Sequence, residues 1–201
     1  MTSRPGLRER KRLDALQRIQ RTALDLFDAH GYDAVTVERV AHEASVSPST
    51  VYRYFGTKEQ LVIHDDYDPA IIRVLEASSS GGSPLGTLRA ALDEVVDQLM
   101  AEEEQRIRRR MRYMYDVPAV NAAFLADVAE AESVLRSTFG RQTGLAPEGL
   151  EMRVYAGTVL AAMLAALRFW YDAEGRESLV DVVRRTIDLL ETTLGAGPAQ
   201  A

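Results

Sequence analysis

The sequence predicts an all-α protein of about nine helices. Apolar residues recur at three- and four-residue steps through most of the 201 residues, and no segment shows a convincing strand-like alternation. Clusters of Gly, Pro and Ser interrupt the helical spacing at intervals. With 46% hydrophobic and 27% charged residues, the chain has the composition of a globular protein and is long enough to bury a sizeable core.

The start of the chain predicts one long helix and one short helix. Apolar residues lie at helical spacing over about 8–30, and the pattern stops at Gly31, a residue type that suits the position after a helix end. Thr36 carries the hydroxyl of an N-cap and precedes the apolar Val37 and Val40. We therefore expect a second helix of about eight residues, at the short end of the globular range.

A Ser-Pro step predicts the third helix. Ser47 is placed as an N-cap and Pro48 as the first helical residue, where its fixed φ and missing N–H are tolerated, so a short helix is expected over 48–54. Thr57 is expected to cap a fourth helix, which ends at the small-residue loop 78–84.

Helical spacing continues through the rest of the chain. We expect a helix over 85–104, then an Arg-rich turn and a short helix before Pro118. Three more helices are expected, over 120–139 with its end at Gly140, over 150–171, and over about 177–194 with its end at Gly195.

Charge is distributed unevenly along the chain. Residues 1–63 contain ten Lys and Arg and eight Asp and Glu, which gives this part a net charge of +2. The rest of the chain has a net charge of −8, and the whole chain one of −6. A mildly basic head on an acidic body is compatible with a head that meets phosphate. Cysteine is absent, which excludes disulfides, thiolate nucleophiles and Cys-ligated zinc. No apolar run approaches the ~20 residues of a membrane span, so a soluble cytoplasmic protein is expected.

The second and third predicted helices form a helix-turn-helix pattern. A helix of about seven residues must place its apolar side on its neighbours. The residues expected to point inward are Val37, Val40, Ala44, Val46, Val51 and Phe55. The residues left to face outward are Ser47, Ser49, Thr50, Tyr52, Arg53 and Tyr54. Hydroxyl, aromatic and Arg side chains suit contact with phosphates and base edges, whereas an ordinary solvated surface is the alternative.

The segment 31–61, GYDAVTVERVAHEASVSPSTVYRYFGTKEQL, resembles the N-terminal signature of the TetR/AcrR family of transcriptional regulators. The family usually has glycine where this chain has Ser45. The resemblance implies a nine-helix homodimer with three DNA-binding helices and a helical body that binds a small molecule, whose entry weakens DNA binding. Repression is the usual polarity. Outside the head, 110–124 and the helix ending at Tyr171 look like the subgroup with an acyl-CoA-like ligand-binding domain.

Two sets of site residues are expected. The operator contacts are assigned to Thr36, Arg39, Ser47, Pro48, Ser49, Thr50, Tyr52, Arg53 and Lys58, with Thr36 and Lys58 near helix N-termini that favour phosphate. A soft, apolar effector pocket is assigned to Met100, Arg108, Met111, Tyr115, Phe124, Met163 and Trp170. Packing in a core and ion pairs on a surface are the alternatives for these apolar residues and for the arginines.

Three regions of the chain receive separate roles. Residues 8–66 are expected to form the DNA-binding domain, with the helix-turn-helix at about 35–54, and 67–195 the ligand-binding and dimerisation domain, between tails 1–7 and 196–201. The small residues of 150–171 and the apolar face of 177–194 suit a four-helix dimer interface, with burial inside one chain as the alternative.

The expected function is that of a DNA-binding regulator without metal or cofactor. No hydrolase elbow, P-loop or dinucleotide fingerprint is present, and the three His have no metal-ligand spacing, so an enzyme is not expected. The alternative is a helical protein-interaction module that binds no specific DNA, its Arg-rich segment docking an acidic partner.

Overall fold

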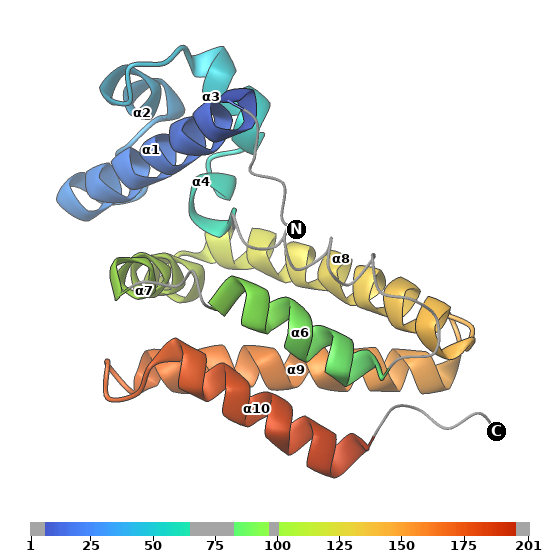
Figure 1. Cartoon of the computed structure of the whole chain (residues 1–201). Helices are drawn as coiled ribbons and strands as arrows, with labels where there is room; N and C mark the ends of the chain where they lie inside the picture. Colours follow the sequence, from blue (N-terminus) through green and yellow to red (C-terminus); the bar gives the residue numbers. More distant parts are fainter. Residues whose placement is uncertain (1–6, 65–82, 97–100, 196–201) are drawn as a thin grey trace. The chain divides into compact units, whose positions relative to one another are not determined.

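The computed structural model describes residues 7–64, 83–96 and 101–195, and this part of the chain is helical without strands (Figure 1). Its nine helices confirm the predicted all-α class. They are α1 Leu7–His30, α2 Val37–Glu43, α3 Pro48–Phe55, α4 Gln60–Ile63, α6 Pro84–Val96, α7 Ala101–Asp116, α8 Pro118–Thr143, α9 Leu150–Asp172 and α10 Leu179–Leu194.

The chain divides into two compact units, and the boundary runs through two helices. The first unit is Met1–Asp66 with Arg109–Leu125, and the second is Tyr67–Arg108 with Ala126–Ala201. The end of α7 and the start of α8 therefore belong with the head, which sequence periodicity did not indicate.

The first unit has its own apolar core. Phe27, Tyr32 and Tyr113 form an aromatic group with ring centroids 5.0–6.4 Å apart. Around them lie the buried faces of α1, α2 and α3 together with Met114 and Val120. Full burial of one such side chain contributes ~1.5–3 kcal/mol, so this core stabilises the short helices that could not form alone.

The second unit is built on α6, α8, α9 and α10. Its core includes Leu85, Phe139, Met152 and Leu190, with the rings of Phe139 and Tyr155 5.7 Å apart. Helices α9 and α10 lie side by side, and Ser178 caps α10 by accepting a hydrogen bond from Asp181 N.

The fourth predicted helix is shorter than expected. Helix α4 ends at Ile63, the backbone of His64 is extended, and residues 65–82, with most of the predicted loop, lie outside the described residues. The expected capping bond of Thr57 is present, since Thr57 Oγ1 accepts a 3.4 Å bond from Gln60 N. The helix itself begins later than expected, because Glu59, which makes no side-chain cap bond, is the residue directly before it.

Two boundaries in the body also differ from the predictions. The predicted Arg-rich turn was wrong: residues 101–116 form one helix, since they contain no Gly or Pro and are rich in residues with high helix propensity. The predicted end at Gly140 was wrong as well, because α8 continues to Thr143 and the positive φ falls at Gly144. A Cβ on Gly140 would lie 3.0 Å from Leu145 O and from Pro147 Cγ, so this glycine permits close packing.

Candidate nucleic-acid interface

The turn between α2 and α3 has the local geometry that its sequence predicts. The Thr36 hydroxyl accepts a 3.2 Å bond from Arg39 N, and the Ser47 hydroxyl accepts one of 3.2 Å from Thr50 N, so both predicted N-caps are confirmed. Ser45 has a φ of 54°, the left-handed conformation that favours glycine. The chain therefore keeps the turn at the position where the resembled family usually has glycine.

The inward faces of these two helices join the core of the first unit. The buried side chains are Val37, Val40, Ala44, Val51 and Phe55, and Val46 and Tyr54 are partly buried against them. This inward set leaves α3 with a polar and aromatic face directed to solvent, as expected for a helix that reads a groove.

Hydroxyl groups cluster at the start of the solvent face. Ser47, Pro48 and Ser49 are exposed and Thr50 is half-buried. Ser47 Oγ lies 2.8 Å from Ser49 Oγ and 2.9 Å from Thr50 Oγ1. These groups can donate to phosphate oxygens without a large rearrangement of the backbone.

The two arginines of the predicted contact set are exposed. Arg53 lies over the ring of Tyr54, with its Cζ 5.0 Å from the ring centroid. Arg39 Nη2 lies 2.7 Å from His30 Nε2. Each guanidinium is thus oriented by a ring and keeps further N–H groups for a duplex.

Tyr52 and Glu38 connect the solvent faces of α3 and α2. Tyr52 is 47% exposed and its hydroxyl donates to Glu38 Oε1 at 3.4 Å. The Glu38 backbone amide, the Thr36 hydroxyl and Tyr52 hold the pKa of Glu38 below its ordinary value. Sequence reasoning did not select Glu38, because the contact joins residues on two helices.

Lys58 is engaged inside the first unit. Its Nζ donates to Tyr32 O at 2.6 Å and lies 4.1 Å from the centroid of the Tyr32 ring. Partial burial lowers the pKa of Lys58, against the opposite effect of Asp33 and Glu59. Its predicted phosphate contact therefore requires the ammonium to leave this carbonyl.

The residues predicted for the effector pocket are distributed over both units. Met111, Tyr115 and Phe124 belong to the first unit, Arg108, Met163 and Trp170 belong to the second, and Met100 lies outside the described residues. Met111 and Trp170 are buried. The Arg108 guanidinium lies 4.1 Å from the Trp170 ring centroid. It also donates to Tyr171 O at 2.9 Å and so binds a carbonyl in the last turn of α9.

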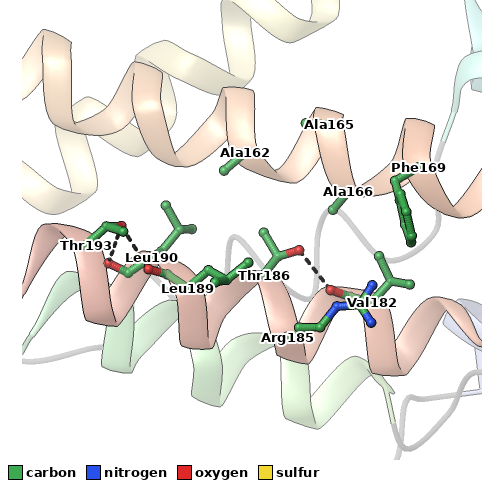
Figure 2. A pocket seen from close by; sticks show the side chains of 10 residues that line it. All are labelled: Ala162, Ala165, Ala166, Phe169, Val182, Arg185, Thr186, Leu189, Leu190 and Thr193. Carbon is green, nitrogen blue, oxygen red and sulfur yellow. Dashed lines mark hydrogen bonds between the residues drawn. The ribbon is translucent and has the colours of Figure 1, made fainter.

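The second unit carries an open apolar groove between α9 and α10 (Figure 2). Its volume is about 430 Å³, and it is lined by Ala162, Ala165, Ala166, Phe169, Val182, Arg185, Thr186, Leu189, Leu190 and Thr193. Figure 2 shows Ala162, Ala166 and Phe169 of α9 directed toward α10. Phe169 and Leu189 are 49% and 60% exposed, which is high for large apolar side chains that line a groove.

Helix α9 also has the length and composition of a membrane-spanning segment, although no membrane span is expected from the sequence, where no apolar run approaches ~20 residues. Only 28% of its most apolar window is buried within the chain. The small and apolar residues on the rest of the helix suit packing against another protein surface as well as they suit a membrane. Composition alone is therefore weak evidence for a membrane.

Both parts of the chain match models of known protein families. Residues 19–64 match the tetR family of bacterial regulatory proteins, and residues 82–195 match the MftR C-terminal domain. The HTH-type transcriptional regulator TcmR of Streptomyces glaucescens is 30% identical over 175 residues, which are 83% of this chain and 77% of TcmR.

Solved structures share the fold. The SmeT–triclosan complex, whose protein represses a multidrug efflux pump of Stenotrophomonas maltophilia, superposes with a TM-score of 0.59 at 19% identity, over 89% of this chain and 90% of SmeT. The TetR-family repressor FadR of Thermus thermophilus, in complex with lauroyl-CoA, superposes with a TM-score of 0.52 at 19% identity, over 92% and 97% of the two chains.

The helix-turn-helix head, the helical body and these matches define a transcriptional regulator that binds DNA, and the chain belongs to the TetR family. Its body is of the MftR C-terminal type. Repression, dimerisation and release by a small effector are typical of the family. The alternative of an interaction module without specific DNA binding is thereby rejected.

Proposed function

We propose that the chain represses transcription as a homodimer in the cytoplasm, that α3 of each protomer enters the major groove of an operator, and that a small apolar or acyl-CoA-like molecule releases it. It acts as a regulator and not as an enzyme. The observation that supports the DNA contacts best is the solvent face of α3, where hydroxyls, Tyr52 and Arg53 are exposed while every large apolar residue of the helix contacts the core.

The proposed operator contacts are tested by substitution on that face. Arg53→Ala is expected to weaken operator binding by about 5- to 150-fold, the loss of ~1–3 kcal/mol that accompanies one base contact. Tyr52→Ala is expected to weaken it too, with the dimer intact. The operator is found by footprinting DNA that flanks the gene, and affinities are measured by fluorescence anisotropy at several salt concentrations.

A matched control distinguishes the loss of a specific Arg53 contact from the general effect of removing one positive charge. Arg153→Ala removes an exposed arginine from α9 in the second unit, and its affinity for the operator should match that of the unmodified protein. If Arg53→Ala and Arg153→Ala bind the operator equally well, Arg53 does not contact it and the proposed contact is wrong. If Tyr52→Ala dissociates the dimer, α3 has a structural role instead.

We assign the groove between α9 and α10 to a second copy of the chain. An apolar groove edged by exposed Phe169 and Leu189 suits a self-complementary interface, and the small Ala165 allows close approach of another helix. Ala165→Glu is expected to yield monomers in analytical ultracentrifugation, whereas Ala129→Glu, an exposed position on α8, is expected to leave dimers. Dimers in both variants would contradict this assignment.

The effector is assigned to the second unit. Trp170 Nε1 and Tyr155 Oη are buried there without a hydrogen-bond partner. Tyr155 lies in the apolar core of this unit, and the Arg108 guanidinium stacks on the ring of Trp170. A mostly apolar ligand with few polar atoms suits such surroundings. SmeT was solved with triclosan and FadR with lauroyl-CoA, which makes these two compounds the first probes. Each is titrated against the protein–operator complex, and release by neither at saturating concentration would reject this effector class.

A further inference from the structure

An acidic side chain lies on the face that is proposed to meet DNA. Glu38 is in the first turn of α2, is exposed, and accepts a hydrogen bond from the Tyr52 hydroxyl of α3 at 3.4 Å. Fourteen residues separate the two along the chain, so the contact depends on the folded helix-turn-helix.

The surroundings of Glu38 keep its carboxylate charged. The Thr36 hydroxyl and the backbone amide of Glu38 donate to it in addition to Tyr52, and these donors lower the pKa of Glu38. Thr36 and Tyr52 are also residues of the proposed operator contacts, and both hydroxyls are of the kind that contacts phosphate oxygens. The carboxylate thus occupies donors that a phosphate oxygen would use.

A tyrosine hydroxyl has one proton to donate. When that proton bonds to Glu38, it is not available to a phosphate oxygen, and a phosphate that approaches Tyr52 also meets the negative charge of the carboxylate. The Glu38 contact must therefore be broken, or the phosphate held at a distance, whenever Tyr52 contacts the backbone of a duplex.

We propose that Glu38 competes with DNA phosphate for the hydroxyl of Tyr52 and thereby weakens binding to any duplex that offers phosphate contacts alone. An operator overcomes this competition through its additional base-edge contacts, and other DNA does not, so Glu38 sets the affinity threshold for stable binding. The inference rests on the proposed use of Tyr52 at the operator.

Glu38→Gln is the decisive substitution, because it removes the negative charge, keeps the size of the side chain and leaves Tyr52 only a weaker, neutral acceptor. Affinity for a random duplex is measured by fluorescence anisotropy at fixed salt, beside the operator as reference. We expect Glu38→Gln to bind the random duplex about threefold to fivefold more tightly, the range of an exposed charge interaction. The operator should also bind more tightly, because its phosphates make the same contact.

Glu43→Gln is the matched control, since Glu43 is an exposed acid of the same helix, and its carboxylate lies 3.7 Å from His42 Nδ1. It changes the net charge equally and should alter affinity by less than about twofold. In a Tyr52→Phe background, which has no phenolic hydroxyl, the effect of Glu38→Gln should shrink to that of Glu43→Gln. Equal effects of Glu38→Gln and Glu43→Gln in the unmodified background would overturn the competition.

A weakened operator complex in Glu38→Gln would also overturn it, because the carboxylate would then be accepting a hydrogen bond from a base amine. Operator binding by Arg53→Ala distinguishes an error about Glu38 from an error about the whole DNA interface. If Arg53→Ala weakens operator binding while Glu38→Gln equals Glu43→Gln, only the role of Glu38 is wrong. If Arg53→Ala leaves binding unchanged, the interface on α3 is wrong.

Discussion

Arg110 offers a stringent test of what holds the head together. Its side chain is buried, with a relative exposure of 4%. Nε donates to Val62 O at 2.6 Å and Nη2 to Ile63 O at 2.5 Å, so one guanidinium satisfies two of the last carbonyls of α4. Those carbonyls have no further helical turn to bind, because the helix ends at Ile63.

Arg110→Met keeps a long apolar stem and removes both donors. Each hydrogen bond from a charged group contributes ~1.5–3 kcal/mol, and two buried carbonyls lose their partner, so we expect about 3–5 kcal/mol of destabilisation. The substitution also removes the cost of burying a charged group, which offsets part of the free energy lost with the two hydrogen bonds. For a domain of 150–250 residues this corresponds to a fall of about 6–20 °C in Tm.

Arg109→Met is the control, one residue away on the same helix. Arg109 pairs with Asp25 and Asp28 at 2.7 Å, and the Asp25 carboxylate is 61% exposed. Exposed pairs contribute ~0.2–1 kcal/mol, so the same change in charge should cost far less at Arg109. The stability of both variants is measured by calorimetry and urea unfolding. Equal losses of stability would show that the α4 carbonyls do not need the buried guanidinium of Arg110.

Three further outcomes follow from particular side chains. Ser45→Gly is expected to raise the free energy of unfolding by about 0.5–1 kcal/mol in urea titrations, because a φ of 54° strains a residue with a Cβ; a loss of stability would contradict this. Tyr155→Phe should be neutral or stabilising at pH 7, because its buried hydroxyl has no partner. Burial raises the pKa of Tyr155 to about 12, so the unfolded chain ionises first and the unmodified protein should lose up to about 2–3 kcal/mol more than Tyr155→Phe between pH 10 and 12. Lys58→Met should destabilise the head by about 1–3 kcal/mol in thermal melts, because Tyr32 O loses its donor; if stability is unchanged while the salt slope of DNA binding falls by about one, Lys58 serves phosphate instead.

The helix-turn-helix was the most predictable part of the molecule, because its signals are local. A hydroxyl at Thr36 and the Ser47-Pro48 step each satisfy backbone groups within three residues, and the structure has both caps where the sequence places them. The inward residues of α2 and α3 follow from periodicity for the same reason. The operator contacts themselves remain a prediction.

The body was harder to predict, because its helix ends depend on distant neighbours. Gly140 has the residue type of a helix end, yet its role is to admit Leu145 O and Pro147, which no pattern along α8 encodes. The end of α4 depends on Arg110, 47 residues beyond Ile63 in the sequence. Similarly, the Tyr52–Glu38 contact joins side chains whose proximity exists only after folding.

The arginines of α7 show how one run of like charges is divided among separate tasks. Arg108 stacks on Trp170 and donates to the last carbonyls of α9, within the second unit. Arg109 and Arg110, the next two residues, bind the aspartates of α1 and the carbonyls of α4, within the first unit. A planar guanidinium suits each of these sites because it stacks on a ring, binds carboxylates in pairs and bridges adjacent carbonyls. Arg108, Arg109 and Arg110 therefore each make structural contacts, and substitutions at Arg108 and Arg110 are expected to act on different units of the protein although only Arg109 lies between them.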